Sequence, residues 1–511
     1  MSGVKLTSIR DTWYHNLEKF PRRTAVVYEG RGYSYEECDR LSESLRRHLR
    51  EDFGMEPGDK VAVAGPNCFE YYVTYWAVIK NGGVVVPVNV RLGEEELAHV
   101  IGNSDARFVV AHEENWATVS QILSRCEGVE KVIGIGVSEA GAESYETLTE
   151  GDGGFDWHPE IAEEDIAIVM HTSGTTGTPK GAMMRHGDLL FNNMLAIYAH
   201  SLRHEDVHML VVPMFHATAL YSLVPTSALL GSTIVLAPKN EISALVQLIH
   251  DYRITTFFGV PTMFHWLAMK KDLDDFDLRS LRLLAYAGSP MPPVTIQKLR
   301  DRFPGVSLHN FFGLTETISM THVLPDGDAD THPESIGKLL PQVSQRIFDE
   351  DGKECAPGEI GELHFHKSNV ICGYWKQPER LDESMKGEWF NTGDLALVDE
   401  DGFVFLKGRS KDMIIVGGEN VFALEVENCI LTHEKVRECA VVGIPATGVR
   451  SYLGELVKAV VVPHDGVELV PPEIKRLCVE KLASYKVPQK IEFMDQLPRN
   501  ASGKVLKRNL Q

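Results

Sequence analysis

The sequence predicts an α/β protein with a large N-terminal domain and a smaller α+β C-terminal domain. Three observations lead to this expectation. The chain has 511 residues, more than a single hydrophobic core usually supports. From Thr24 to about Asn310, short β-branched runs alternate with amphipathic stretches, as in βαβ units with mainly parallel sheets. After Thr331 the segments become shorter, and turn residues separate them.

The N-terminal alternation predicts individual strands and helices. The strands are expected at residues 84–86, 107–111, 166–170, 209–212 and 233–236, and the helices at residues 94–102, 217–230 and 242–252. Their number and the length of the chain favour two βαβ-type sheets rather than one.

The downstream region predicts a small β-barrel-like unit of antiparallel hairpins. Turn signals occur at residues 349–352, 357–358 and 399–402. Beyond Arg409 follows an α+β stretch of about a hundred residues, within the usual size of one domain. We therefore expect an N-terminal domain of residues 1–409 and a C-terminal domain of residues 410–511.

Charge and hydropathy limit the classes of partner. The formal net charge is -21 and no block of basic residues is present, so a nucleic-acid partner is not expected. No apolar run approaches the roughly 18 residues that span a bilayer, and the first residues do not resemble a secretory leader. The eight cysteines form no CxxC pair. We expect a cytoplasmic protein without stable membrane insertion.

The most informative segment is the glycine-rich stretch Thr172–Gly181, which follows an apolar strand. Its sequence, TSGTTGTPKG, offers five hydroxyl side chains, exposed N–H groups and the ammonium of Lys180 to phosphate oxygens. It differs from the Walker phosphate loop because Pro179 precedes the lysine and no Ser or Thr follows it. Taken alone, the segment could also be a solvated turn.

Five further segments accompany the glycine-rich loop in a fixed order. They are AYAGSP (285–290), NFFGLTE (310–316), NTGDL (391–395), GRSKD (408–412) and LPRNASGKV (497–505). Together with the loop they resemble the adenylate-forming superfamily, which contains acyl-CoA synthetases, firefly luciferase and the adenylation domains of nonribosomal peptide synthetases. The resemblance implies the acyl-CoA synthetase or acid–CoA ligase branch, with ATP, Mg²⁺ and CoA as cofactors and a role in fatty acid metabolism.

The resemblance also implies which residues bind the nucleotide. The predicted ATP and AMP contacts are Thr172, Ser173, Gly174, Thr175, Thr176, Gly177, Lys180, Gly288, Ser289, Asn310, Phe311, Phe312, Gly313, Asp394 and Arg409. Phe312 replaces the family's usual tyrosine and would stack on adenine. Asp394 would accept hydrogen bonds from the ribose hydroxyls, a task that suits a carboxylate.

By the same resemblance, Lys504, Glu316, Thr315 and His216 are the predicted catalytic residues. Lys504 would bridge the attacking carboxylate and the α-phosphate, Thr315 would contact that phosphate, and Glu316 would hold magnesium. Lys411 falls at the family's hinge position, about which a mobile C-terminal domain would alternate between two half-reactions.

The predicted thiol and acyl sites complete the set. Gly417, Gly418 and Glu419 would face CoA, although the nearby family segment Gly-x-Pro-Asp reads GIPA at residues 443–446, which departs from the pattern. The predicted acyl pocket comprises Phe215, His216, Leu220, Val260, Ala287, Gly288 and Met320. Because these residues are mostly apolar, a medium-chain fatty acid or an aromatic acid is the expected substrate.

Three alternatives stay open at this point. The enzyme could load its acid onto a carrier protein, or the chain could be an inactive nucleotide-binding protein. The spacing of His200, His204 and His208 could also indicate a metal site, although Glu205 and Asp206 are expected to end the helix before His208. A carboxylic acid, ATP and CoA are the partners expected, with a homodimer as an open alternative.

Overall fold

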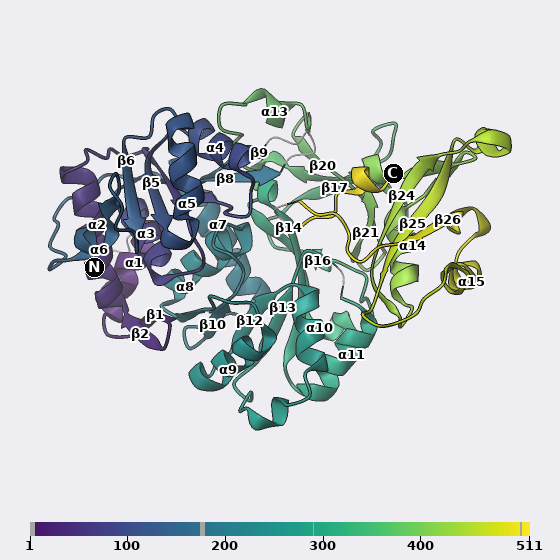
Figure 1. Cartoon of the computed structure of the whole chain (residues 1–511), viewed down its shortest axis with the longest axis horizontal. Helices are drawn as coiled ribbons and strands as arrows, with labels where there is room; N and C mark the ends of the chain where they lie inside the picture. Colours follow the sequence, from purple (N-terminus) through teal and green to yellow (C-terminus); the bar gives the residue numbers. More distant parts are fainter. Residues whose placement is uncertain (1–5, 174–178, 290, 501–502) are drawn as a thin grey trace. The chain divides into compact units, whose positions relative to one another are not determined.

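The chain folds into two units. The computed structural model describes residues 6–173, 179–289, 291–500 and 503–511 (Figure 1). The first unit consists of Met1–Pro333, Gly337–Val343 and Lys367–Ser384, and the second of Glu334–Ile336, Ser344–His366 and Met385–Gln511. The boundary expected after Arg409 and the hinge expected at Lys411 remain predictions.

A nine-stranded sheet is the first of two large sheets in the first unit. Its strands are β1 (Thr24–Tyr28), β2 (Arg31–Ser34), β10 (Val207–Leu210), β11 (Thr233–Leu236), β12 (Thr256–Gly259), β13 (Leu283–Tyr286), β14 (Ser307–Leu314), β15 (Ser319–Leu324) and β16 (Lys338–Leu339). Their order is β16-β15-β14-β13-β12-β10-β11-β1-β2. All pairs from β14 to β1 are parallel, whereas the outer pairs are antiparallel.

A seven-stranded sheet is the second. Its strands are β3 (Lys60–Ala64), β4 (Val84–Val88), β5 (Ala106–His112), β6 (Lys131–Ile135), β7 (Glu143–Ser144), β8 (Ile166–Ser173) and β9 (Pro179–Arg185), in the order β7-β6-β5-β3-β4-β8-β9. Only the pair β8–β9 is antiparallel among these described strands. The predicted α/β class with two βαβ-type sheets is confirmed.

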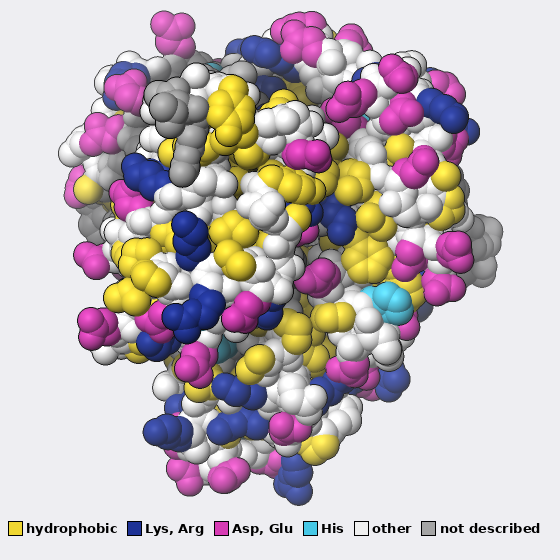
Figure 2. Space-filling view, turned by 90° about the vertical axis from the view of Figure 1, so that its right-hand side faces the viewer, with side chains coloured by type: hydrophobic (Ala, Val, Ile, Leu, Met, Phe, Trp, Pro, Cys, Tyr) yellow, Lys and Arg dark blue, Asp and Glu magenta, His cyan; other side chains and the backbone are white. Residues whose placement is uncertain are grey.

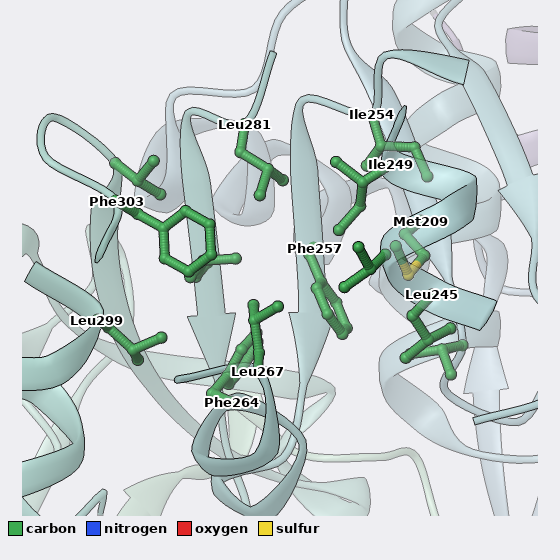
Figure 3. Close-up of a cluster of buried hydrophobic side chains, with 14 of the residues drawn as sticks. Met209, Leu245, Ile249, Ile254, Phe257, Phe264, Leu267, Leu281, Leu299 and Phe303 are labelled. Carbon is green, nitrogen blue, oxygen red and sulfur yellow. The ribbon is translucent and has the colours of Figure 1, made fainter. Parts of the chain in front are cut away.

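Helices cover the sheets of the first unit. They are α1 (Ile9–Lys19), α2 (Tyr35–Glu51), α3 (Phe69–Lys80), α4 (Glu94–Asn103), α5 (Glu113–Ile122), α6 (Tyr145–Thr149), α7 (His186–His200), α8 (Val224–Leu230), α9 (Ile242–Tyr252), α10 (Pro261–Met269), α11 (Pro293–Arg302), α12 (Asp326–Ala329) and α13 (Glu379–Asp382). Apolar side chains of α9, α10 and α11 pack onto the nine-stranded sheet (Figure 3). The rings of Phe257 on β12 and Phe264 on α10 lie 4.8 Å apart there. Burying each such ring contributes roughly 1.5–3 kcal/mol.

One predicted helix differs from the structure. Residues 217–230 do not form a single α-helix but a π-helix, Thr218–Leu223, followed by α8. The reason is Pro225, which has no N–H to donate to the carbonyl of Tyr221 four residues earlier. The side-chain amide of Asn192 donates to that carbonyl instead, at 3.1 Å.

The second unit is built mainly on antiparallel pairs, with one parallel pair, β25–β26. It contains β17 (Gln345–Phe348), β18 (Gly361–His366), β19 (Met385–Lys386), β20 (Trp389–Val398) and β21 (Val404–Arg409) in one sheet, β22 (Ile414–Val416) and β23 (Glu419–Val421) in a hairpin, and β24 (Val436–Pro445), β25 (Glu455–Pro463) and β26 (Lys490–Phe493) in a third sheet, with α14 (Ala423–Leu431) and α15 (Pro471–Lys481). The predicted turn at 399–402 joins β20 to β21, and Gly402 N–H donates to Asp399 O at 3.1 Å. The five-stranded sheet corresponds to the predicted small β unit.

The surface carries both signs of charge. Figure 2 shows acidic and basic side chains interspersed on the face that it views. Among the residues that the structure describes, no helix combines the length and the apolar character needed to cross a bilayer. The net charge of the chain is -21, so its overall electrostatic field repels polyanions. A polyanionic ligand would therefore be held by local hydrogen-bond donors and cations.

Candidate active site

Four neighbouring parallel strands bring predicted site residues to one edge of the nine-stranded sheet. After β10 the chain continues to β11 on one side, whereas β12 pairs with the other side of β10. Such a reversal of strand order is where open α/β sheets bind ligands, at the carboxyl ends of the strands. The segments that follow these ends are residues 211–216 after β10, Val260 after β12, residues 287–289 after β13, and the end of β14.

His216 lies in the turn after β10. Its N–H donates to Pro213 O at 2.9 Å, and its ring centroid is 4.9 Å from that of Phe215, which is buried. Burial and, to a smaller extent, the nearby Arg91 lower the pKa of His216 to about 4. The imidazole is therefore uncharged at neutral pH, and the charge near it is that of Arg91, which lies 5.8 Å from the ring centroid of Phe215.

The other predicted acyl-pocket residues divide into two groups. Val260, Ala287 and Gly288 follow strand ends and keep part of their surface exposed. Leu220 on the π-helix and Met320 on β15 are buried, and Asn192 on α7 connects their elements. Its amide donates to the carbonyl of Tyr221 and its carbonyl accepts from the N–H of Met320 at 3.3 Å. The sequence did not indicate Asn192, because its hydrogen bond with Met320 joins residues that are 128 positions apart.

The glycine-rich loop connects two antiparallel strands, β8 and the edge strand β9. Residue Thr172 on β8 pairs with Lys180 on β9. The predicted ligands Gly174, Thr175, Thr176 and Gly177 lie outside the described residues. Because a strand, and not a helix, follows the loop, its architecture differs from that of the Walker loop, as the sequence predicted.

Glu316 meets the glycine-rich region across the two sheets of the first unit. It lies in a 3₁₀ turn, Thr315–Thr317, between β14 and β15. The hydroxyl of Thr172 donates to Glu316 Oε1 at 3.5 Å, and the hydroxyl of Tyr374 donates to the same oxygen at 3.0 Å. The structure therefore brings together two predicted site residues that are far apart in sequence.

Tyr374 was missed by the sequence analysis. Its ring is buried and lies 5.3 Å from the ammonium of Lys180, measured to the ring centroid. Burial raises the pKa of Tyr374 above its ordinary value, and the nearby Glu316 raises it further. The phenol therefore keeps its proton and donates a hydrogen bond to the carboxylate. An aromatic residue directly after Gly373 in a turn-rich stretch was the only signal that the sequence carried.

The predicted adenine residues alternate along β14. Phe311 is buried, and its ring centroid lies 5.4 Å from that of His200 and 6.1 Å from that of Phe258. Phe312 points to the opposite face, as successive strand residues do, and is only partly buried. Of the two rings, Phe312 has the surface free to stack on a base, whereas the side chain of Phe311 packs in the interior.

The remaining residues predicted to contact the nucleotide on this unit lie on β14 and just after β13. Asn310 on β14 pairs with Tyr286, the last residue of β13, and Gly313 opposes Met320 across β15. Gly288 and Ser289 are exposed. Gly288 has φ +90° with open space around it, so a backbone conformation that favours glycine, and not crowding, requires glycine here.

In the second unit, Asp394 and Arg409 are direct cross-strand partners on β20 and β21. Arg409 Nε lies 2.7 Å from Asp394 Oδ1, and Asp394 is 6% exposed. Lys504 is close to this pair: partial desolvation lowers its pKa, Arg409 and Lys411 lower it further, and Asp394 opposes them. Three predicted functional cations and one predicted ribose ligand therefore gather in this unit.

A short turn presents Lys504. Its N–H donates to Asn500 Oδ1 at 2.8 Å, and its carbonyl accepts from Asn500 N–H at 2.9 Å. Gly503 has φ +83°, a conformation that glycine adopts without strain. Residues 501 and 502 of the predicted lysine loop lie outside the described residues.

Comparison with known proteins identifies the family. The model of the AMP-binding enzyme family matches residues 13–375, and that of the AMP-binding enzyme C-terminal domain matches residues 425–504. The chain belongs to the AMP-binding enzyme family. The predicted membership in the adenylate-forming superfamily, on its acid–CoA ligase branch, is thereby confirmed.

Individual relatives of this AMP-binding enzyme are CoA ligases. A feruloyl-CoA synthase from an Amycolatopsis species is 35% identical over 489 residues, covering 95% of both chains. A long-chain-fatty-acid–CoA ligase from Salmonella typhimurium is 31% identical, covering 99% of this chain and 94% of the relative. The crystal structure of an anthranilate CoA ligase with anthranoyl-AMP aligns with a TM-score of 0.91 at 26% identity, covering 100% and 98%.

These similarities establish the class of reaction. The chain is an AMP-forming acid–thiol ligase, an acyl-CoA synthetase, and its substrates include ATP and CoA. The carrier-protein alternative is not favoured, because the three proteins described above are named for CoA.

The CoA residues predicted for this AMP-binding enzyme lie in the β22–β23 hairpin. Gly417 and Gly418 have φ of +62° and +90°, and Glu419 is exposed. Residues 454 and 455 lie beside this hairpin: Gly454 pairs with Val416, and the carboxylate of Glu455 accepts from Ile415 N–H at 2.8 Å.

The alternative of a histidine metal site is not supported, and the helix ends before His208, as expected. His200 ends α7, His204 lies in the following turn, and His208 lies on β10. His208 bonds Thr256 and Ser232, and no group of three potential metal ligands occurs among the described residues.

Proposed function

We propose that this enzyme converts an acid with an uncharged acyl part, either an aromatic acid or a medium-chain fatty acid, into its CoA thioester by way of an acyl-AMP. The observation that carries the choice of substrate is the neutral His216 at the end of β10. An uncharged imidazole can face an acyl group without a buried charge, which would be costly. The amino-acid-activating relatives use a carboxylate at this position, whereas this chain has none there.

The aromatic version has the support of a feruloyl-CoA synthase as a relative and of an anthranilate CoA ligase as a structural neighbour. The aliphatic version has the support of the long-chain-fatty-acid–CoA ligase. We place the aromatic acid first, because the feruloyl enzyme has the higher identity of the two relatives.

Thioester formation requires a better leaving group than oxide on the acyl carbon, and adenylation supplies AMP as that group. In the first half-reaction a carboxylate oxygen attacks the α-phosphorus of ATP and pyrophosphate departs; in the second, the thiol of CoA attacks the acyl carbon and AMP departs. Thr172 and Lys180 would donate to phosphate oxygens, Asp394 would accept from the ribose, and Lys504 would offset negative charge at the α-phosphate. Arg409 would orient Asp394 through the ion pair described above.

Magnesium fits the surroundings of Glu316. Among the described residues, both side-chain hydrogen bonds to this carboxylate end on Oε1, so Oε2 can bind a hard cation. Mg²⁺ commonly takes one or two carboxylates together with phosphate oxygens, so a cluster of acidic residues is not needed. When bound, the ion would neutralise charge on the phosphates.

The test is acid-dependent AMP formation by the purified chain. We expect AMP and pyrophosphate with ferulate or benzoate, with octanoate as the aliphatic comparison and phenylalanine as the amino-acid control. CoA should accelerate AMP release and yield the thioester. Activity with phenylalanine alone, or pyrophosphate release that no acid stimulates, would contradict the proposal.

A further inference from the structure

The segment 371–375 fastens together two parts of the first unit that are predicted to bind Mg–ATP. The N–H of Ile371 donates to the carbonyl of Glu316 at 2.9 Å. The N–H of Trp375 donates to the carbonyl of Gly181 at 2.7 Å, on the strand that leaves the glycine-rich loop. The backbone of this short segment therefore spans from one sheet to the other.

The side chain of Tyr374 repeats this connection. Its hydroxyl donates to Glu316 Oε1 at 3.0 Å, while its ring lies 5.3 Å from Lys180 Nζ. The residue is 6% exposed, so both contacts are largely shielded from solvent. One side chain thus touches both the predicted magnesium ligand and the predicted phosphate-binding lysine.

We propose that Tyr374 is a positioning residue for the magnesium–ATP complex. Its hydroxyl fixes the rotation of the Glu316 carboxylate, so that the other oxygen points to the ion. Its ring holds the ammonium of Lys180 by a cation–π contact. The inference rests on the proposed function, because it assigns to Tyr374 a task at the ATP site proposed there.

A positioning role makes a prediction that ordinary packing does not. Removing the hydroxyl frees the Glu316 carboxylate to rotate, and this should weaken ATP binding only when magnesium is present. A hydroxyl with a purely structural role would change the affinity for ATP equally with and without the metal. The ratio of the two affinities therefore separates the roles within one variant.

Tyr145 offers a matched control. It is 4% exposed, and its hydroxyl donates to the carbonyl of Glu70 at 3.1 Å. Tyr145→Phe thus deletes the same atom at a similar burial in the same unit. Tyr374→Leu, as a second variant, removes the aromatic ring together with the hydroxyl.

The experiment is titration calorimetry of the full chain with ATP, once with Mg²⁺ and once with EDTA. For Tyr374→Phe we expect the affinity for Mg–ATP to fall roughly tenfold, as for a lost hydrogen bond to a charged group, with metal-free binding unchanged. Tyr145→Phe should change both affinities by about twofold or less. Tyr374→Leu should lose Mg–ATP affinity further and also weaken metal-free binding, because Lys180 loses its ring.

Two outcomes would overturn the inference. One is a Tyr374→Phe protein whose affinity ratio equals that of the wild type, including the case where only the leucine variant is impaired. The other concerns the double variant Tyr374→Phe with Glu316→Gln. If Tyr374 acts through Glu316, Tyr374→Phe should have little further effect on Mg–ATP affinity once Glu316 is replaced, so additive losses of affinity would contradict the inference. Wild-type protein that releases no pyrophosphate with any acid would instead contradict the proposed function and leave the binding ratios interpretable by themselves.

Discussion

The two units carry their predicted ATP-contacting residues on different kinds of structure. In the first unit, Phe312 and Gly288 belong to the ends of parallel strands in a sheet buried under helices. In the second, Asp394 lies in an antiparallel pair, and Lys504 lies in an exposed turn held by Asn500. The comparison teaches that the residues predicted to contact the acid and the adenine lie on a sheet buried under helices, whereas the predicted ribose ligand and the predicted α-phosphate lysine lie on a hairpin and in a turn.

The sharpest test of this comparison is Lys504→Ala. Because the ammonium would offset charge at the α-phosphate, its loss should slow acyl-AMP formation roughly 10²–10³-fold. Thioester formation from presynthesised acyl-AMP should be largely spared. Single-turnover assays of the two half-reactions measure both effects.

Arg508→Ala is the matched control, because Arg508 is an exposed cation in the same C-terminal segment. It should leave both half-reactions unchanged. Equal losses of both half-reactions in Lys504→Ala would refute the division of tasks between the units.

The next largest effect is expected from Asp394→Ala. It removes the carboxylate that Arg409 contacts at 2.7 Å and that is predicted to bind the ribose. We expect KM for ATP to rise about 10–100-fold, as for hydrogen bonds to a charged group, without a change in the preference among acids. Asp401→Ala, in the exposed turn between the same strands, is the control. A changed acid preference would show that the second unit also selects the acid.

The two units should also differ in how strongly low pH lowers their stability. Among the described residues of the first unit, seven histidines have pKa values lowered chiefly by burial: His158, His171, His186, His200, His208, His216 and His309. In the described part of the second unit, His364 is the one histidine of this kind. A histidine with a lowered pKa resists protonation only in the folded state, so its contribution to stability is complete above pH 6.5 and is lost as the pH falls.

His186→Leu tests this point with the least disturbance. His186 is fully buried with a pKa of about 4, and its ring nitrogens have no hydrogen-bond partner among the described residues. Between pH 6.5 and 4, the unfolding free energy of the variant should fall less steeply than that of the wild type, by about 1.4 kcal/mol per pH unit. Urea titrations across this range measure the slope. Parallel curves would show that His186 is protonated equally in both states.

The smallest effect is expected at an exposed ion pair of the first unit. Arg125 NH2 lies 2.7 Å from Glu95, with side chains 40% and 90% exposed. Arg125→Ala should change the unfolding free energy by about 0–1 kcal/mol and leave adenylation unchanged. A larger loss would mean that surface charges contribute to the stability that we assign to the buried sheet.

Much of the scaffold was predictable from local pattern. The strand at 233–236 and the helix at 242–252 have the predicted bounds, because β-branched runs and amphipathic spacing express burial directly. The π-helix could not be predicted from local pattern, since it depends on Pro225 together with the side-chain amide of Asn192 on α7. The contact between Tyr374 and Glu316 spans 58 residues and exists only after both sheets have formed. Local pattern contains no signal for such a contact.

The placement of Val260 and Ala287 just beyond strand ends has an evolutionary consequence. Neither residue belongs to a strand, and Val260 is 41% exposed. Exchanges at such positions can therefore accumulate with little penalty for folding, so a lineage built on this framework can adopt new acids by drift. A laboratory library restricted to these positions should yield altered substrate range in proteins that still express well.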